Sequence, residues 1–329
     1  MKYSYDYKGL GAEIDQIASW DYIRQGYLLC PRTVFKGRTR TQRSGLPCPS
    51  VKSRDLPSVA HKTLESAMGP MQGFRRAIMF SGGFDSLLLT YLAQSLGAQV
   101  KALTVQFESY NPMTVAGSIE TAESAGLEHH ILHVNLAEFL SSFEQVARLT
   151  DEPVLDLELA VSYAALRKYD PDMAGDTFIS GMGGDQWLGD VALDVRYGNF
   201  DQRLVQSNVN EDAHHRVAET CGYQFIFPFL SGPMLSLSQV VPAAMKKNKK
   251  ILRQLALANI VAPKGSVREL QVPILMRRIL IELYGKKAWP SPVAFDRNKS
   301  SDEHLQDLRK IVLGLWLSAN TKKLRASKA

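Results

Sequence analysis

Two short glycine-rich segments carry hydroxyl and carboxylate side chains in an order that suits phosphate and metal binding. The first, Ser-Gly-Gly-Phe-Asp-Ser, covers residues 81–86 and follows the apolar run 75–80. Glycines let backbone N–H groups approach phosphate oxygens, and the N-terminus of a following helix favours an anion. Asp85 alone would repel phosphate, so its presence indicates a Mg²⁺ ion that bridges carboxylate and phosphates. The alternative is an ordinary turn in which Asp85 or Ser86 caps the helix.

The second segment follows the same logic. Its sequence is Ser-Gly-Met-Gly-Gly-Asp-Gln, and it comes directly after the apolar run 176–180. Alone, this segment could equally be a simple turn. Loops that follow parallel strands open at one edge of a sheet, however, so two such loops can face one ligand. We therefore predict that Asp85 and Asp185 bind Mg²⁺ together.

The elements that position these loops alternate between apolar runs and helical patterns. We expect strands at 75–80, 100–107, 129–134 and 176–180. Helical patterns of about 10–15 residues separate them, which predicts an α/β fold with a parallel sheet and flanking helices. Strand signals fade beyond Tyr197, so the C-terminal part is expected to be mostly helical. The expected helices there are 234–245, 249–258 and 267–283.

We expect three regions along the chain. Residues 1–70 form a helical and loop-rich segment, with a short helix at 61–68. Residues 71–200 form the nucleotide-binding α/β domain, and residues 201–329 form a helical region on the substrate side.

Composition excludes several classes of protein. No apolar run reaches the roughly 18 residues of a membrane helix, and the N-terminus has no signal-like apolar stretch. The three cysteines are far apart, so neither a zinc site nor a disulfide framework is indicated, and a cytoplasmic location is expected. The net charge of +6 is concentrated at 32–43, 246–253 and 322–328. Such runs could hold a polyanion or could be solvated surface.

Several motifs together resemble the synthetase domain of asparagine synthetase and its relatives, the β-lactam synthetases and lasso-peptide cyclases. SGGFDS is similar to the SGGxDS loop that many ATP pyrophosphatases of the PP-loop superfamily share, and SGMGGDQWLG is similar to the SGxGADExxGG loop. The other similar segments are GYLLCPRTVFKG, TDEPVLD, FPFLS and KKILRQLA followed by LANIVAP. The resemblance covers about residues 20–272 and implies an adenine nucleotide α-hydrolase-like fold.

The resemblance also implies roles for individual residues. Asp85 and Asp185 would hold Mg²⁺, and Lys249 or Lys250 would contact pyrophosphate. Phe80 and Val105 would offer backbone groups to adenine. The full set of implied nucleotide-binding residues is Phe80, Ser81, Gly82, Gly83, Asp85, Ser86, Val105, Ser180, Gly181 and Gly183.

Departures from that family concern the substrate side. Relatives that hydrolyse glutamine begin with a catalytic cysteine on a separate domain, whereas Lys2 follows the first residue here, so no glutaminase is expected. Met182 stands where relatives carry a Glu or Tyr that positions or deprotonates the amine, which a thioether cannot do. Around the PFLS turn, Gln224, Ile226 and Ser231 replace the usual Glu, Arg and Asp. Free aspartate is therefore not the expected substrate.

Two groups of residues are candidates for the missing functions. His214 or His215 could serve as the base, because imidazole titrates near neutral pH, or the two could form a surface pair on a helix. We include His215 among the catalytic candidates. The acidic residues Asp151, Glu152 and Asp156 could bind a substrate amine or cap a helix.

The sequence thus predicts an ATP- and Mg²⁺-dependent amide ligase. A small-molecule or peptide carboxylate would be activated as acyl-AMP and attacked by an amine or ammonia, in specialised natural-product or peptide biosynthesis. A partner protein could supply ammonia or carry the substrate, whereas neither a membrane nor nucleic acid is an expected partner. The alternatives are a PP-loop enzyme acting on RNA and a degenerate ATP-binding regulatory subunit.

Overall fold

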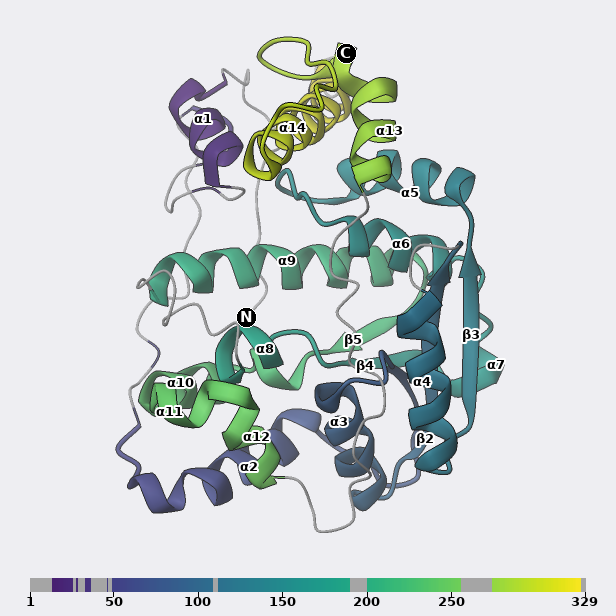
Figure 1. Ribbon diagram of the computed structural model, residues 1–329, viewed down its shortest axis with the longest axis vertical. Helices are drawn as coiled ribbons and strands as arrows, with labels where there is room; N and C mark the ends of the chain where they lie inside the picture. Colours follow the sequence, from purple (N-terminus) through teal and green to yellow (C-terminus); the bar gives the residue numbers. More distant parts are fainter. Residues whose placement is uncertain are drawn as a thin grey trace.

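A parallel β-sheet lies at the centre of the protein, as seen in a computed structural model that describes residues 14–25, 28, 33–36, 46, 49–108, 112–189, 200–255 and 274–326. The sheet has five strands in the order β3-β2-β1-β4-β5 (Figure 1). The strands are β1 (Arg75–Met79), β2 (Gln99–Phe107), β3 (His129–Val134), β4 (Thr177–Ser180) and β5 (Gln224–Ile226). Every neighbouring pair is parallel, which confirms the predicted α/β class.

The strand order contains a reversal beside β1. The chain builds β1, β2 and β3 outward in one direction and then crosses over to place β4 on the other side of β1. Met79, at the end of β1, pairs with Leu103 on one side and with Ser180 on the other. Loops that leave adjacent strands toward opposite faces open a crevice at such a reversal, and this is where open α/β sheets bind ligands.

The stretch of chain from the first glycine-rich loop to the end of the second contains a series of helices. They are α3 (Phe84–Ser95), α4 (Pro112–Ser124), α5 (Leu136–Leu149), α6 (Leu157–Leu166), α7 (Pro171–Ala174) and α8 (Gly184–Leu188). α5 begins with a capping box, in which the Asn135 side chain accepts from the backbone of Glu138 and the Glu138 side chain accepts from that of Asn135. α3 begins after Gly83, so neither Asp85 nor Ser86 is its cap, contrary to the simple-turn alternative.

The remaining helices form two groups at opposite ends of the molecule (Figure 1). At one end, α14 (Ser301–Ala326) packs against α1 (Gln16–Gln25), α13 (Ile274–Tyr284) and α5. At the other end, α2 (Leu56–Met68) packs against α10 (Gly232–Val240) and α12 (Lys250–Leu255). The last two helices are α9 (Phe200–Thr220), which crosses the middle of the view, and the short α11 (Ala243–Lys246). Short 3-10 turns lie at Ser53–Asp55, Pro228–Leu230, Lys247–Lys249 and Gly285–Lys287.

The structure corrects several predicted elements. β5 lies in the region expected to have no strand, so the sheet continues beyond Tyr197. α2 begins at Leu56, upstream of the predicted start. The predicted helix 234–245 is divided between α10 and α11, because Pro242 has no backbone N–H and disfavours helical geometry at Val241. Residues 256–258 and 267–273 of the other two predicted helices lie outside the described residues.

The hydrophobic core lies between the sheet and its helices. Ala77, Ile78, Phe178 and Ile179 on the central strands are fully buried, as is Leu88 on α3. Side chains of the size of Ile78, Phe178 and Leu88 each contribute about 1.5–3 kcal/mol when they are withdrawn from water. Within the ranges that the structure describes, no helix has both the length and the apolar character needed to cross a membrane.

Candidate functional site

The two glycine-rich loops contact each other at the carboxyl edge of the sheet. A Cβ atom built on Gly181 would lie 3.3 Å from the Asp85 Cβ atom. One built on Gly184 would lie 2.6 Å from the Asp85 Oδ2 atom. The loops predicted to face one ligand therefore meet at the reversal between β1 and β4, and glycine at these positions permits the contact.

The first loop is held by contacts that only glycine allows. Gly82 has a φ of +70°, and a Cβ there would lie 2.7 Å from the Ser118 Cα atom of α4. The Ser81 hydroxyl is exposed and accepts a hydrogen bond from the Gly83 backbone N–H at 3.3 Å. The Ser86 hydroxyl is buried and donates to the Gly83 carbonyl at 3.1 Å. Both hydroxyls brace the loop itself.

The second loop is anchored to the PFLS turn. Gly183 has a φ of +94°, and a Cβ there would lie 2.5 Å from the Leu230 Cδ2 atom. The Ser180 hydroxyl accepts from the Met182 backbone N–H at 3.2 Å. The Met182 side chain is partly buried and packs against the hydrophobic core. The position at which relatives were expected to carry a Glu or Tyr thus contributes packing.

Asp85 and Asp185 converge on one ammonium group. Lys249 Nζ lies 2.9 Å from Asp85 Oδ2 and 2.8 Å from Asp185 Oδ1. Burial alone would lower the pKa of Lys249, but the two carboxylates outweigh burial and the pKa is raised. Lys250 is the exposed first residue of α12, so of the two candidate lysines it is Lys249 that lies at the carboxylates.

A divalent cation fits this pair of carboxylates. Both side chains offer hard oxygen ligands toward one point, the type of donor that Mg²⁺ prefers. Over the described ranges, no group of three or more His, Cys, Asp or Glu side chains forms a metal-binding cluster. An ion held by Asp85 and Asp185 would take its other ligands from water and phosphate, as Mg²⁺ usually does at nucleotide sites.

A buried hydrogen-bonded chain lies behind Phe80, the residue that precedes the first loop. The Thr104 hydroxyl donates to the Phe80 carbonyl at 2.5 Å and lies 2.8 Å from His129 Nε2. The His129 ring also contacts the Phe80 ring edge-on, with 5.9 Å between centroids. Burial, followed by the neighbouring His130, lowers the pKa of His129, so the imidazole is held neutral. Val105 follows Thr104 in β2, which places both residues implied for adenine contact at this edge.

The candidate bases lie on α9 against the end of β5. His215 packs edge-on against Phe227 at 5.1 Å between centroids and lies 3.8 Å from the Glu211 carboxylate. His214 packs against the same ring, and its Nδ1 atom lies 2.9 Å from the Asn210 carbonyl oxygen. The polar contacts of both imidazoles are therefore with α9 itself. Their proposed role as a base stays a prediction.

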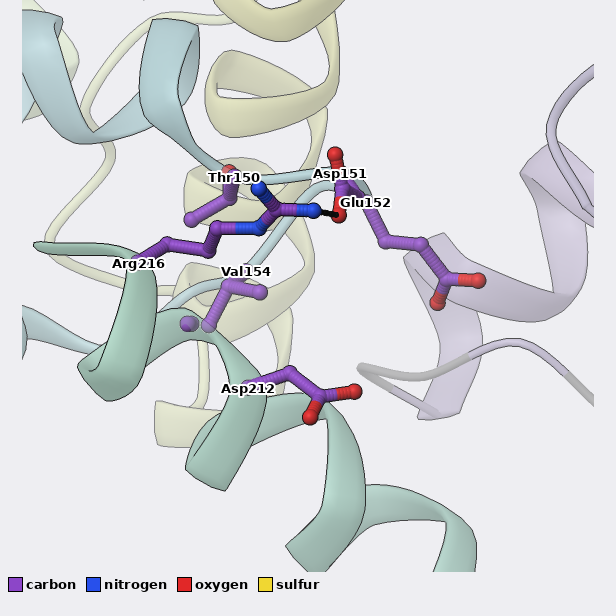
Figure 2. Close-up of a pocket in the computed structure, with 7 residues that line it drawn as sticks. Thr150, Asp151, Glu152, Val154, Asp212 and Arg216 are labelled. Atoms are coloured by element: carbon purple, nitrogen blue, oxygen red, sulfur yellow. Dashed lines mark hydrogen bonds and ion pairs between the residues drawn. The ribbon is translucent and has the colours of Figure 1, made fainter. Parts of the chain in front are cut away.

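The acidic cluster divides between structural roles and an open hollow. Asp156 caps α6 by accepting from the Leu159 N–H at 3.0 Å, as one of the two alternatives anticipated. Asp151 forms an ion pair of 2.7 Å with Arg216 of α9 across the hollow shown in Figure 2. In that view the Glu152 carboxylate points away from Arg216. The hollow is lined by Thr150, Asp151, Glu152, Val154, Asp212, Ala213 and Arg216.

Three contributors to the site had no signal in the sequence that singled them out. Gly184 was read only as part of a glycine-rich loop, although it is the residue against which Asp85 packs. Thr104 looked like an ordinary strand residue. Arg253 stacks its guanidinium over the Phe84 ring at 5.5 Å from the centroid, beside the first loop. Arg253 belongs to the basic segment 246–253, and the sequence did not indicate which side chains of that segment would point toward the loops.

Comparison with protein families matches the part of the chain that contains the two glycine-rich loops. The asparagine synthase family model matches residues 70–192, which include both glycine-rich loops. For this part of the chain the predicted resemblance is confirmed. Among curated proteins no match was found.

The solved structures that match this chain come from several kinds of protein. A U34-tRNA thiolase from Methanococcus maripaludis is 13% identical, over 92% of this chain and 88% of that chain, with a TM-score of 0.36. A protein described as a predicted tRNA methyltransferase subunit from Methanocaldococcus jannaschii is 18% identical, over 69% and 94%, with a TM-score of 0.32. An NMN synthetase from Francisella tularensis is 14% identical, over 65% and 100%, with a TM-score of 0.31. Likenesses this distant carry no argument about substrate.

Proposed function

We propose that this protein is an ATP-dependent amide ligase that activates a carboxylate as an acyl adenylate. Pyrophosphate leaves, and an amine or ammonia then attacks the acyl group. The observation that carries the proposal is the meeting of Asp85 and Asp185, from two glycine-rich loops, around one cationic group at the reversal of the sheet. The asparagine synthase match over the same loops supports it.

The chain's own groups suit a nucleotide at this edge. The N-terminus of α3 and the glycine backbone of residues 82–83 favour phosphate oxygens. The resemblance implies that backbone groups of Phe80 and Val105 would contact adenine, and Val105 lies near the carboxyl end of β2. Mg²⁺ held by Asp85 and Asp185 would neutralise charge on the phosphates. Lys249, which lies beside Asp85, would add a positive charge for the departing pyrophosphate.

The proposed reaction needs positioning more than covalent catalysis by the protein. The carboxylate oxygen attacks the α-phosphorus, and the bond to pyrophosphate breaks. The amine nitrogen then attacks the acyl carbon, and AMP departs with the carboxylate oxygen. Holding both substrates at the crevice between β1 and β4 would supply much of the rate enhancement. In this proposal the carboxylate belongs to a small molecule or a peptide, and a partner protein supplies the ammonia or carries that substrate.

One observation favours a second function, an ATP-binding regulatory subunit. Met182 packs against the core at the position where relatives were expected to carry the group that handles the amine. A chain that has lost this group could bind nucleotide without turning it over.

An isotope-transfer experiment tests both functions. The protein is incubated with ATP, Mg²⁺, an amine panel and candidate carboxylates labelled with ¹⁸O. The proposed ligase releases pyrophosphate and transfers one ¹⁸O atom to AMP. ADP with phosphate as products would contradict adenylate formation. ATP binding without pyrophosphate release for any carboxylate would favour the regulatory subunit, and release that depends on added RNA would favour an RNA-modifying enzyme.

A further inference from the structure

Lys249 stands at the point that the proposed function assigns to a divalent cation. We propose that its ammonium group is a resident counter-ion, which holds the Asp85–Asp185 pair when no nucleotide is bound and must leave before a divalent metal can enter. The inference rests on the proposed function only for the identity of the site. It adds that metal and nucleotide enter together, because the free protein keeps its own cation there.

The contacts of Lys249 are those of an enclosed ion pair. Its side chain is 16% exposed, that of Asp85 is 13% exposed and that of Asp185 is 34% exposed. The same nitrogen lies within 3 Å of an oxygen on each carboxylate, at 2.9 and 2.8 Å. Charges withdrawn from water interact more strongly than exposed charges, so the ammonium of Lys249 is held more strongly here than in an ion pair at the open surface. A lysine side chain is protonated at neutral pH, since its ordinary pKa is about 10.4.

Each carboxylate packs against a glycine on the second loop or at the end of the helix that follows it. The Asp85 Oδ2 atom lies beside Gly184, where a Cβ would lie only 2.6 Å away. Gly189 packs against Asp185 in the same manner, with a Cβ position 2.7 Å from Oδ1. A metal ion that binds the same two carboxylate oxygens would occupy nearly the same place as the ammonium. Two cations at one place repel each other, so binding of the metal and binding of Lys249 exclude each other.

The backbone of Lys249 is held in an unusual conformation. Its φ of +52° lies in the left-handed region, which side chains other than glycine, asparagine and aspartate rarely adopt. The residue joins the 3-10 turn Lys247–Lys249 to α12, and the flanking residues Lys246, before the turn, and Ile251, in α12, are buried. Such conformations persist where surrounding packing fixes them, and they gather at ligand sites and switches. The packing here turns one lysine of a basic segment toward the two loops.

Displacement of the ammonium would be favoured by nucleotide phosphates. They supply the metal with further oxygen ligands and supply Lys249 with a new anionic partner. Neither exchange is available to a metal ion that arrives alone. The free protein should therefore bind divalent metal weakly, and nucleotide should strengthen metal binding. Coupling of this kind between neighbouring ligands typically amounts to roughly 5–150-fold in affinity.

Mn²⁺ binding without nucleotide tests the proposal, with free Mn²⁺ measured by electron paramagnetic resonance. Lys249→Met removes the charge, and Lys249→Asn removes it with a residue that tolerates positive φ. We expect each variant to bind one Mn²⁺ about tenfold or more tightly than the wild type, within the usual range of such coupling. Lys247→Met is the matched control, since it removes an exposed lysine from the same turn and should leave the affinity unchanged.

Two further measurements place the effect and guard against misfolding. Adding Asp185→Asn to Lys249→Met should abolish the gain, because one carboxylate is lost. Mg²⁺ alone should raise the unfolding temperature of Lys249→Met and Lys249→Asn but not that of the wild type, since a ligand that binds only the folded state stabilises it. Equal Mn²⁺ affinity in wild type and both folded variants would overturn the proposal. None of these measurements needs turnover. Absence of pyrophosphate release would therefore refute the ligase function, whereas the Mn²⁺ affinities alone decide whether Lys249 is a resident counter-ion.

Discussion

The carboxylate of Asp85 fills the space left by the missing side chain of Gly184. A Cβ atom at Gly184 would lie 2.6 Å from Asp85 Oδ2 and 2.8 Å from its Cγ atom. These residues are almost a hundred positions apart in the sequence, yet each sets the place of the other. The position of the carboxylate therefore depends on the second loop as well as on its own.

Gly184→Ala should displace the Asp85 carboxylate without an unfavourable backbone conformation. Misplacement by about 1 Å can cost roughly 100-fold in rate, and we expect a loss of that order in pyrophosphate release. The control is Gly222→Ala, whose φ of +81° is costly but whose Cβ would meet nothing within 4 Å. That variant should lose stability and keep activity. Retained activity in Gly184→Ala would show that the contact does not constrain the site.

Asp85→Asn and Asp185→Asn should each suppress pyrophosphate release. An amide keeps the size of the side chain but loses the charge that would hold a metal ion, and loss of one preorganised electrostatic group typically costs about 100- to 1,000-fold. Circular dichroism should show an intact fold, because each residue lies in the first turn of its helix and the amide keeps the size of the side chain. Asp55→Asn, at an exposed carboxylate, is the control. If either variant kept wild-type turnover, the substituted aspartate would not belong to the proposed metal site.

Thr104→Val should weaken both folding and nucleotide binding. It removes the hydroxyl that donates to the Phe80 carbonyl and contacts His129, and leaving buried polar groups without that partner costs about 1–3 kcal/mol. Urea unfolding measures the stability, and equilibrium binding of ATP measures the site. Thr104→Ser keeps the hydroxyl and should stay close to wild type in ATP affinity. If Thr104→Val and wild type bound ATP equally well, the hydrogen bonds of Thr104 would have no part in nucleotide binding.

The lowered pKa of His129 predicts a loss of stability in mild acid. The unfolded chain takes up a proton near the ordinary histidine pKa of about 6.5, whereas burial and His130 disfavour protonation of the folded protein. The contribution of His129 to stability therefore falls as the pH drops below about 6.5 and levels off once the folded-state pKa is passed. Burial raises the pKa of Glu158 to about 7, so protonation of that carboxyl acts in the opposite direction over the same range. The test is therefore a difference between two proteins: from pH 7 to pH 5, urea unfolding should show that wild type loses stability relative to His129→Gln. Glu138, whose pKa is lowered, loses its contribution near and below pH 4.5, outside this window.

His215 is the candidate base whose role remains a prediction. His215→Ala should lower amide formation more than adenylate formation, with adenylate formation followed by pyrophosphate exchange. Phenylalanine at this position keeps a ring against Phe227 but cannot accept a proton, so His215→Phe separates packing from proton transfer. Equal losses in both half-reactions, or none, would direct attention to the hollow beside Asp151 and Arg216.

Much of the nucleotide half could be predicted from sequence, because its signals are local. The apolar run 75–80, the glycine-rich loop and the following helix are neighbours along the chain, and their order alone specifies a strand, a turn and a helix. The helix Leu136–Leu149 likewise lies between two of the predicted strands, where a helical pattern was expected. Short elements could not be predicted in this way. β5 has three residues, too few for a periodic signal, and it exists because β4 offers it an edge to pair with.

The tertiary structure alone decided which residues meet. Sequence identified Asp85, Asp185 and two adjacent lysines, but not which lysine would reach the carboxylates. The left-handed backbone of Lys249 settled that choice. Nor could spacing reveal that Gly184 makes room for Asp85. Residue type and local pattern report chemical capacity and backbone preference, whereas contact between distant segments depends on strand order and packing, and these are fixed only when the whole core forms.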